Sequence, residues 1–167
     1  MGNISRWGGW VRSPWSVLDH TITGALVMTH LKNPPMIIRA WLLHDVEETE
    51  FMGDVPTPHK ERFCNDAYHE AVTDFVRRLA VETSVRIFSP ATITAVKRVD
   101  EIMLRAEYAT VSLKVDPAPR MDENVLMAMS LISHIGSYGG DRTQMFWQMW
   151  STNDVGTSVI HPFKSTH

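Results

Sequence analysis

The sequence predicts an all-α fold, and three observations support this prediction. Apolar residues recur at intervals of three and four along several stretches, the spacing that places them on one face of a helix. Alternating patterns typical of strands are nearly absent. Short clusters rich in proline or glycine separate the helical stretches. A chain of 167 residues can bury a core, and we expect one domain over residues 1–167, a compact bundle of about five to seven helices.

The first two helices are predicted from residue 16 to the stretch "LLHD". Residues 1–15, rich in glycine, tryptophan and arginine, precede them as an irregular arm. Apolar positions recur at helical spacing over residues 16–31, and "KNPP" ends this helix. Proline is tolerated in a first helical turn, so Pro34 and Pro35 are suited to begin the next helix, which we expect to continue to His44. The stretch "MGDVPTP" then predicts a turn-rich loop.

Three longer helices and a short one are expected after this loop. The third helix is predicted over residues 62–82, with an inward face of Ala71, Phe75, Val76 and Leu79. Ser89 followed by Pro90 is typical of a helix start. The inward stripe of this fourth helix is predicted to hold Ile93, Val96, Asp100, Met103, Leu104 and Glu107. A fifth helix is expected over residues 123–134, and "MFWQMW" predicts a short aromatic-rich helix.

Composition limits the class of function. The net charge is −3, which argues against a surface for nucleic-acid polymers. A single cysteine, Cys64, excludes an internal disulfide and fits a reducing cytoplasm. No apolar run is long enough to cross a membrane, so we expect no membrane partner. Six tryptophans and ten methionines exceed what one small core should hide, which predicts a homo-oligomer.

Four polar residues stand on or beside the predicted inward stripes: His20, His44, Asp45 and Asp100. Ionisable groups at such positions need partners, because burying them alone is costly. A single histidine would more often be a hydrogen-bonded core or surface residue. Two neutral imidazoles with two carboxylates, however, suit a divalent transition metal, with Co²⁺ or Zn²⁺ first and Mn²⁺ or Fe²⁺ as further candidates.

The motifs around these residues resemble those of the HD-domain phosphohydrolases. The stretch "SVLDHT" resembles the family's "SVAEHS", and "VKRVDEIMLRAE" resembles its "VKxADxxxLxxE". The stretch "LLHDVEETEFMGDVPTPHK" is similar to "LLHDAxEAxxGDxPxPxK" of the subgroup that cleaves 2′-deoxynucleotides. The similarity covers about residues 6–110. It implies an HD-domain bundle with every ligand on a helix, completed by the C-terminal helices, and it implies that the metal ligands are His20, His44, Asp45 and Asp100.

The resemblance implies further roles for residues of the loop and the arm. Glu48 matches the acid that orients or deprotonates the attacking water, but one extra residue before "GD" leaves Glu47 as an alternative. Asp54 matches a proton donor to the leaving oxygen. Lys60 would pair with a phosphate. The pair "RW" at positions 6 and 7 resembles the Arg-Trp pair of bacterial 5′-deoxynucleotidases.

That pair lies over the sugar and phosphate in those enzymes. Arg6 and Trp7 are therefore expected to bind substrate, with Trp7 crowding the 2′ position so that a ribose hydroxyl is disfavoured. Trp10 or Trp15 could take the place of Trp7.

The activity implied by the resemblance is metal-dependent hydrolysis of 2′-deoxynucleotides. We expect a dATP triphosphohydrolase that yields deoxyadenosine, similar to compact HD proteins of phages, with Mg²⁺ on the substrate phosphates as a further candidate ion. The alternative is a 5′-deoxynucleotidase. A non-catalytic nucleotide-binding module, a bundle stabilised by a metal, and a hydrolase of cyclic nucleotides or guanosine alarmones also stay open. We expect a dimer or hexamer in the cytoplasm, that of the host if the chain is phage-encoded.

Overall fold

The computed structural model describes residues 2, 4–50, 53, 62, 64–113 and 121–153. Among these residues the only β pairings are two isolated bridges, Ser5 with Ser16 and Val11 with Ser112. The predicted all-α class is confirmed, with six helices of at least eight residues in the described part. None of the described helices is both long and apolar enough to cross a membrane. The elements are η1 (Arg6–Gly9), α1 (Val17–His30), α2 (Pro35–Leu42), α3 (Glu47–Glu50), α5 (Asp66–Glu82), α6 (Pro90–Thr110), α7 (Glu123–Ser137) and α8 (Arg142–Thr152).

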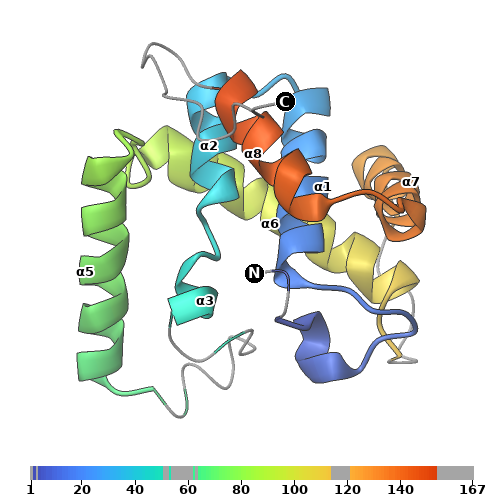
Figure 1. The fold of residues 1–167 in the computed structure, drawn as a ribbon, viewed down its shortest axis with the longest axis horizontal. Coiled ribbons are helices and arrows are strands. Elements are labelled where there is room, and N and C mark those ends of the chain that lie inside the picture. Colours follow the sequence, from blue (N-terminus) through green and yellow to red (C-terminus); the bar gives the residue numbers. More distant parts are fainter. Residues whose placement is uncertain are drawn as a thin grey trace, which may run out of the picture.

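Helix α1 lies at the centre of the bundle (Figure 1). It packs against α2, α6, α7 and α8, and α6 also packs against α2 and α7. Helix α5 stands at the edge of the molecule with α3 beside it, on the side opposite to α7 (Figure 1). The helices predicted to carry the ligands therefore meet in the middle of the bundle, between the α5 side and the α7 side.

The close packing of α2 on α1 depends on a glycine and a tryptophan. Trp41 is fully buried, and its indole N–H donates to the carbonyl of Thr21 on α1 at 2.8 Å. A Cβ atom at Gly24 would lie 1.9 Å from Cζ2 of Trp41, so only glycine allows this approach. These contacts fix the C-terminal end of α2, and with it His44, against the middle of α1.

The predicted starts of α1, α2 and α6 are confirmed, and α1 and α6 have side-chain caps. The Ser16 side chain accepts from the Asp19 N–H while the Asp19 carboxylate accepts from the Ser16 N–H, which is a capping box. Helix α2 begins at Pro35. The Ser89 hydroxyl accepts from the N–H of Thr92 at the start of α6.

The sequence prediction is wrong in detail for two helices, α5 and α6. Helix α5 begins at Asp66 rather than residue 62, and its predicted inward residue Ala71 is exposed, because the main described neighbour of α5 is the short α3. On α6, Ile93 and Leu104 are exposed rather than inward. The buried face is made by other residues: Thr92, Val99, Ile102, Met103, Ala106 and Glu107. A helix rotates by 100° per residue, and the predicted stripe is therefore centred on the edge of the buried face rather than on its middle. Asp100 lies at this edge.

Candidate metal centre

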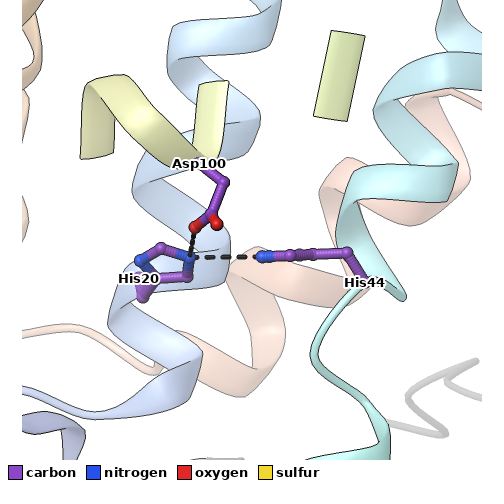
Figure 2. A group of neighbouring side chains, drawn as sticks. All are labelled: His20, His44 and Asp100. Atoms are coloured by element: carbon purple, nitrogen blue, oxygen red, sulfur yellow. Dashed lines mark hydrogen bonds and ion pairs between the residues drawn. The ribbon is translucent and has the colours of Figure 1, made fainter. Parts of the chain in front are cut away.

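Three parts of the fold bring the four predicted ligands together. His20 comes from the first turns of α1 and is fully buried. His44 and Asp45 follow directly after α2, and Asp100 lies in the middle of α6. Figure 2 shows the side chains of His20, His44 and Asp100 pointing toward one another from these three segments. We call the four residues the candidate metal centre.

The ligand atoms gather around Nε2 of His20. This nitrogen lies 3.2 Å from Nε2 of His44 and 3.7 Å from Oδ1 of Asp100 (Figure 2). It lies 3.6 Å from Oδ2 of Asp45, which is itself 3.2 Å from His44 Nε2. The centre is buried on the His20 side and open on the Asp100 side, where the carboxylate side chain is 52% exposed. The structure therefore brings His20, His44 and Asp100 together as a group that could hold one ion, while Asp45 lies beside the two histidines.

The expectation that every ligand lies on a helix is wrong for His44 and Asp45. Helix α2 ends at Leu42, and these two residues lie in the turn that follows. His44 Nδ1 lies 2.6 Å from the carbonyl oxygen of Trp41, which also accepts from the His44 N–H at 3.1 Å. The imidazole thus takes up a carbonyl that a continuing helix would use, and such side-chain bonds compete with the helix. The turn points both side chains toward α1.

The hydrogen bonds of the two histidines determine which nitrogens face the centre. The Trp41 carbonyl can only accept, so Nδ1 of His44 carries the hydrogen. His20 Nδ1 donates likewise to Oε1 of the buried Glu107 at 2.6 Å. In neutral rings both Nε2 atoms then present lone pairs, which face each other at 3.2 Å. Two lone pairs at this distance repel unless a cation lies between them.

The donor set and the local charge fit a divalent ion. Ligand atoms about 2.1 Å from one ion lie roughly 3 to 3.5 Å from each other, close to the separations around His20. Among the described residues that contact the centre, the carboxylates of Asp45, Asp100 and Glu107 exceed the guanidinium of Arg6 by two charges when the imidazoles are neutral. An ion of charge +2 would balance them. Mixed imidazole and carboxylate ligation suits zinc, cobalt, manganese or iron.

Without a metal ion, a proton meets the same demand for positive charge. Burial lowers the pKa of His44, but the charge of Asp45 and its hydrogen bond outweigh this and raise the pKa to about 9. Burial likewise opposes the shift of Asp45, yet the charge of His44 holds the pKa of this carboxyl below its usual range. A metal ion must therefore displace a proton, so metal affinity is expected to increase with pH.

Glu107 is a site residue that the sequence interpretation missed. It was predicted only as one member of the inward stripe, and the structure shows it fully buried against the centre. Its carboxylate contacts His20, and the charge of His20 outweighs burial and lowers the pKa of Glu107 to about 2. The available signal was its spacing: residue 107 stands seven positions after Asp100, two turns along the same side of α6.

The N-terminal arm, residues 4–15, is fastened to the bundle beside the centre. Its two bridges join Ser5 to Ser16 and Val11 to Ser112. Within η1, Trp7 has a positive φ of 61°, an uncommon backbone conformation for a large side chain. This conformation accompanies contacts with α6: the indole N–H donates to Glu107 Oε2 at 3.2 Å, and the ring lies 5.9 Å from that of Tyr108.

Arg6 belongs to this arm and contacts the centre itself. It is buried, and its Nη1 lies 3.2 Å from Oδ2 of Asp45. Of the two alternatives to Trp7, Trp10 is 69% exposed and Trp15 is buried with its N–H donated to Glu107. The expected substrate-binding pair therefore lies next to the ligands, and its contact with substrate stays a prediction.

The predicted catalytic acids lie partly outside the described residues. Glu48 is on α3, directly after the ligand turn; its side chain is buried and its N–H donates to the carbonyl of Asp45 at 3.1 Å. The side chain of Glu47 is half-buried. The role of either acid stays a prediction. Asp54 and Lys60 lie outside the described residues.

Comparisons with known proteins give no relative for this chain. No protein-family model, no curated protein and no solved structure matches it. Conclusions about function therefore depend on the sequence motifs and on the geometry of the candidate metal centre.

Proposed function

We propose that this protein is a metal-dependent phosphohydrolase of 2′-deoxynucleotides, with dATP as its substrate and deoxyadenosine as its product. The observation that carries the proposal is the convergence on His20 Nε2 of the second imidazole Nε2, from His44, and of two carboxylate oxygens, all within 3.7 Å. The HD-like motifs around these residues support it. So does the opening at Asp100, through which a phosphate oxygen can approach the centre.

The protein's own groups would hold the ion and set the local charge. His20, His44, Asp45 and Asp100 would bind the ion through one nitrogen or oxygen each. A divalent ion bound there supplies Lewis-acid activation of water and of the phosphoryl group. The acidic surroundings matter as well: without a cation the centre would repel a phosphate, so substrate and ion are expected to bind together. Arg6 restrains Asp45 from the arm side.

The acid beside the ligand turn is suited to orient the attacking water. Glu48 lies on α3 directly after the turn that carries His44 and Asp45, and its burial favours a single side-chain position. Glu47 is the alternative on the same helix. Asp54 would protonate the leaving oxygen, and Lys60 would neutralise phosphate charge.

The arm supports a deoxynucleotide as the substrate. Trp7 contacts the ring of Tyr108 and donates a hydrogen bond to Glu107, which in turn accepts a hydrogen bond from the ligand His20. The face of such an indole ring offers no hydrogen-bond partner to a 2′-hydroxyl packed against it, and an unsatisfied hydroxyl lowers affinity. Trp10, which is 69% exposed on the same arm, offers a ring on which a purine base can stack.

The test is a substrate panel with separated products. Deoxynucleoside triphosphates, deoxynucleoside monophosphates and the matching ribonucleotides are incubated with Co²⁺, Zn²⁺, Mn²⁺ and Mg²⁺, and nucleosides are identified by chromatography. Asp45→Ala removes a ligand. Asp74→Ala is the matched control, because Asp74 is exposed on α5, where its carboxylate pairs with the neighbouring, equally exposed Arg77.

The outcomes separate the alternatives. We expect deoxyadenosine from dATP with the native chain and with Asp74→Ala, and none with Asp45→Ala. If only deoxynucleoside monophosphates are hydrolysed, the protein is a 5′-deoxynucleotidase and the proposal of dATP hydrolysis is wrong. Metal binding with no turnover of any nucleotide would disprove hydrolysis and leave a binding module or a metal-stabilised bundle.

A further inference from the structure

The carboxylate of Glu107 receives donors from two different parts of the molecule. Its Oε1 atom lies 2.6 Å from Nδ1 of the ligand His20 and 2.9 Å from Nε1 of Trp15. Both of these neighbours are buried, at 0% and 3% exposure. Oε1 therefore faces the interior and one ligand of the candidate metal centre.

The other oxygen faces the N-terminal arm. Oε2 accepts the indole N–H of Trp7 at 3.2 Å and lies 3.5 Å from Nη2 of Arg6. Nη1 of the same guanidinium contacts Asp45, a second ligand, at 3.2 Å. The arm thus reaches the centre by two routes, through Glu107 to His20 and through Arg6 to Asp45.

This arrangement is more than an ion pair that neutralises a buried charge. A carboxylate can accept about four hydrogen bonds, and here four donor groups surround its two oxygens, two at each. Because His20 donates to Oε1 from Nδ1, its Nε2 atom carries a lone pair that faces the centre. A glutamine side chain of the same size could accept hydrogen bonds at only one of these two positions, because the other would hold an NH₂ group, which is a donor.

We propose that Glu107 is a positioning residue with two separate tasks, one for each oxygen. Oε1 fixes the tautomer and the ring orientation of His20 for metal binding, and Oε2 holds Arg6 and Trp7 of the arm beside the centre. The first task rests on the metal centre of the proposed function. Neither task depends on which phosphate ester or anhydride the protein cleaves.

Three single variants separate the two tasks. Glu107→Gln affects both oxygens with almost no change in size. Trp7→Phe removes only the arm-side N–H. Glu101→Gln is the matched control, since it makes the same charge change on an exposed residue of α6. Each chain is titrated with Co²⁺ or Zn²⁺ alone, the visible spectrum of its cobalt form is recorded, and the rate of trypsin cleavage after Arg6 is followed in the metal-free chain by mass spectrometry.

The expected results differ between the variants. Glu107→Gln should weaken metal binding by about 10- to 100-fold, the usual effect of losing an outer partner of a ligand, and should alter the cobalt spectrum at saturation. It should also speed cleavage after Arg6 by about tenfold as the arm opens. Trp7→Phe should speed this cleavage while metal affinity stays within about threefold. Glu101→Gln should match the native chain throughout.

Clear results would overturn the inference. If Glu107→Gln keeps the native metal affinity and the native cobalt spectrum, Oε1 does not orient His20. If Glu107→Gln and Trp7→Phe are both cleaved at the native rate, Oε2 does not hold the arm. If Glu107→Gln does not fold, NMR of the histidine ring nitrogens in the native chain tests the first task, because a hydrogen on Nε2 of His20 contradicts it. If the native chain binds no metal, the proposed function is wrong. The cleavage rates would still test whether Oε2 holds the arm.

Discussion

Two regions of α6 each place one carboxylate at the same centre, and the two carboxylates differ in their exposure to solvent. Asp100 lies at the margin of the buried face, and its side chain is 52% exposed. Glu107 lies two turns later, fully buried and surrounded by donors from His20, Trp15, Trp7 and Arg6. A helix that rotates 100° per residue places both side chains toward α1.

The difference shows how burial assigns roles to two similar acids. The open carboxylate keeps lone pairs that a metal ion and solvent can reach, so it can serve as a ligand. The buried carboxylate has its lone pairs occupied by protein donors, so it can orient groups but has little left to offer an ion. Substitutions at the two positions should therefore damage different properties.

The largest effect is expected from Asp100→Ala on metal binding. Losing a direct ligand should reduce affinity by more than about a hundredfold, beyond what loss of an outer partner causes. The unfolding free energy of the metal-free chain should change by only about 1 kcal/mol, because the side chain is half exposed. Calorimetric titration with Zn²⁺ and denaturant unfolding check both values. Native affinity in this variant would contradict the assignment of Asp100 as a ligand.

The reverse pattern is expected from Glu107→Ala. Four donor groups would lose a buried acceptor, and breaking a buried charged network typically costs about 3–5 kcal/mol of unfolding free energy. Denaturant unfolding of the metal-free chain measures this loss directly. A destabilisation no larger than that of Asp100→Ala would show that the two acids are equivalent and would break the comparison.

The contrast between the two acids also shows what the sequence could predict. Helix starts were predictable where a capping residue precedes an apolar period, as at Ser16 and Ser89. The ligands could be grouped because their motifs resemble those of a known family; the structure brings His20, His44 and Asp100 together and places Asp45 against both histidines. The inward position of Glu107 was predicted, but its role was not, because that role depends on three donors from residues 6–15 that lie far away in the chain.

The turn after α2 was unpredictable for a related reason. The apolar period of α2 continues to His44, so the sequence predicts a helix there. The bond between the His44 ring and the Trp41 carbonyl depends on how Trp41 packs on α1, which is a tertiary effect. For α5, the apolar positions indicate an inward face, but the elements that would cover it cannot be read from the spacing alone.

A smaller effect is expected from acid on the metal-free chain. The folded pKa of Glu107 is about 2, below the ordinary value of 4.5, so its charge stabilises the fold above about pH 4.5 and this stabilisation is lost as pH falls toward 2. The loss amounts to about 3 kcal/mol. Unfolding free energies from pH 6 to pH 2 should therefore fall less steeply for Glu107→Gln than for the native chain. Equal slopes would exclude Glu107 as a source of acid sensitivity.

The smallest effect is expected from Trp15→Phe, which removes one donor from Glu107 and leaves Asp100 untouched. The N–H that Trp15 donates at 2.9 Å goes to a charged acceptor, and such bonds contribute about 1.5–3 kcal/mol. Because His20, Trp7 and Arg6 continue to satisfy the carboxylate, the loss should fall at the lower end of this range. Thermal unfolding of the metal-free chain measures it, with Trp147→Phe as the control, since Trp147 is 46% exposed on α8. A loss as large as that of Glu107→Ala would mean that Trp15, rather than the carboxylate, holds this side of the centre together.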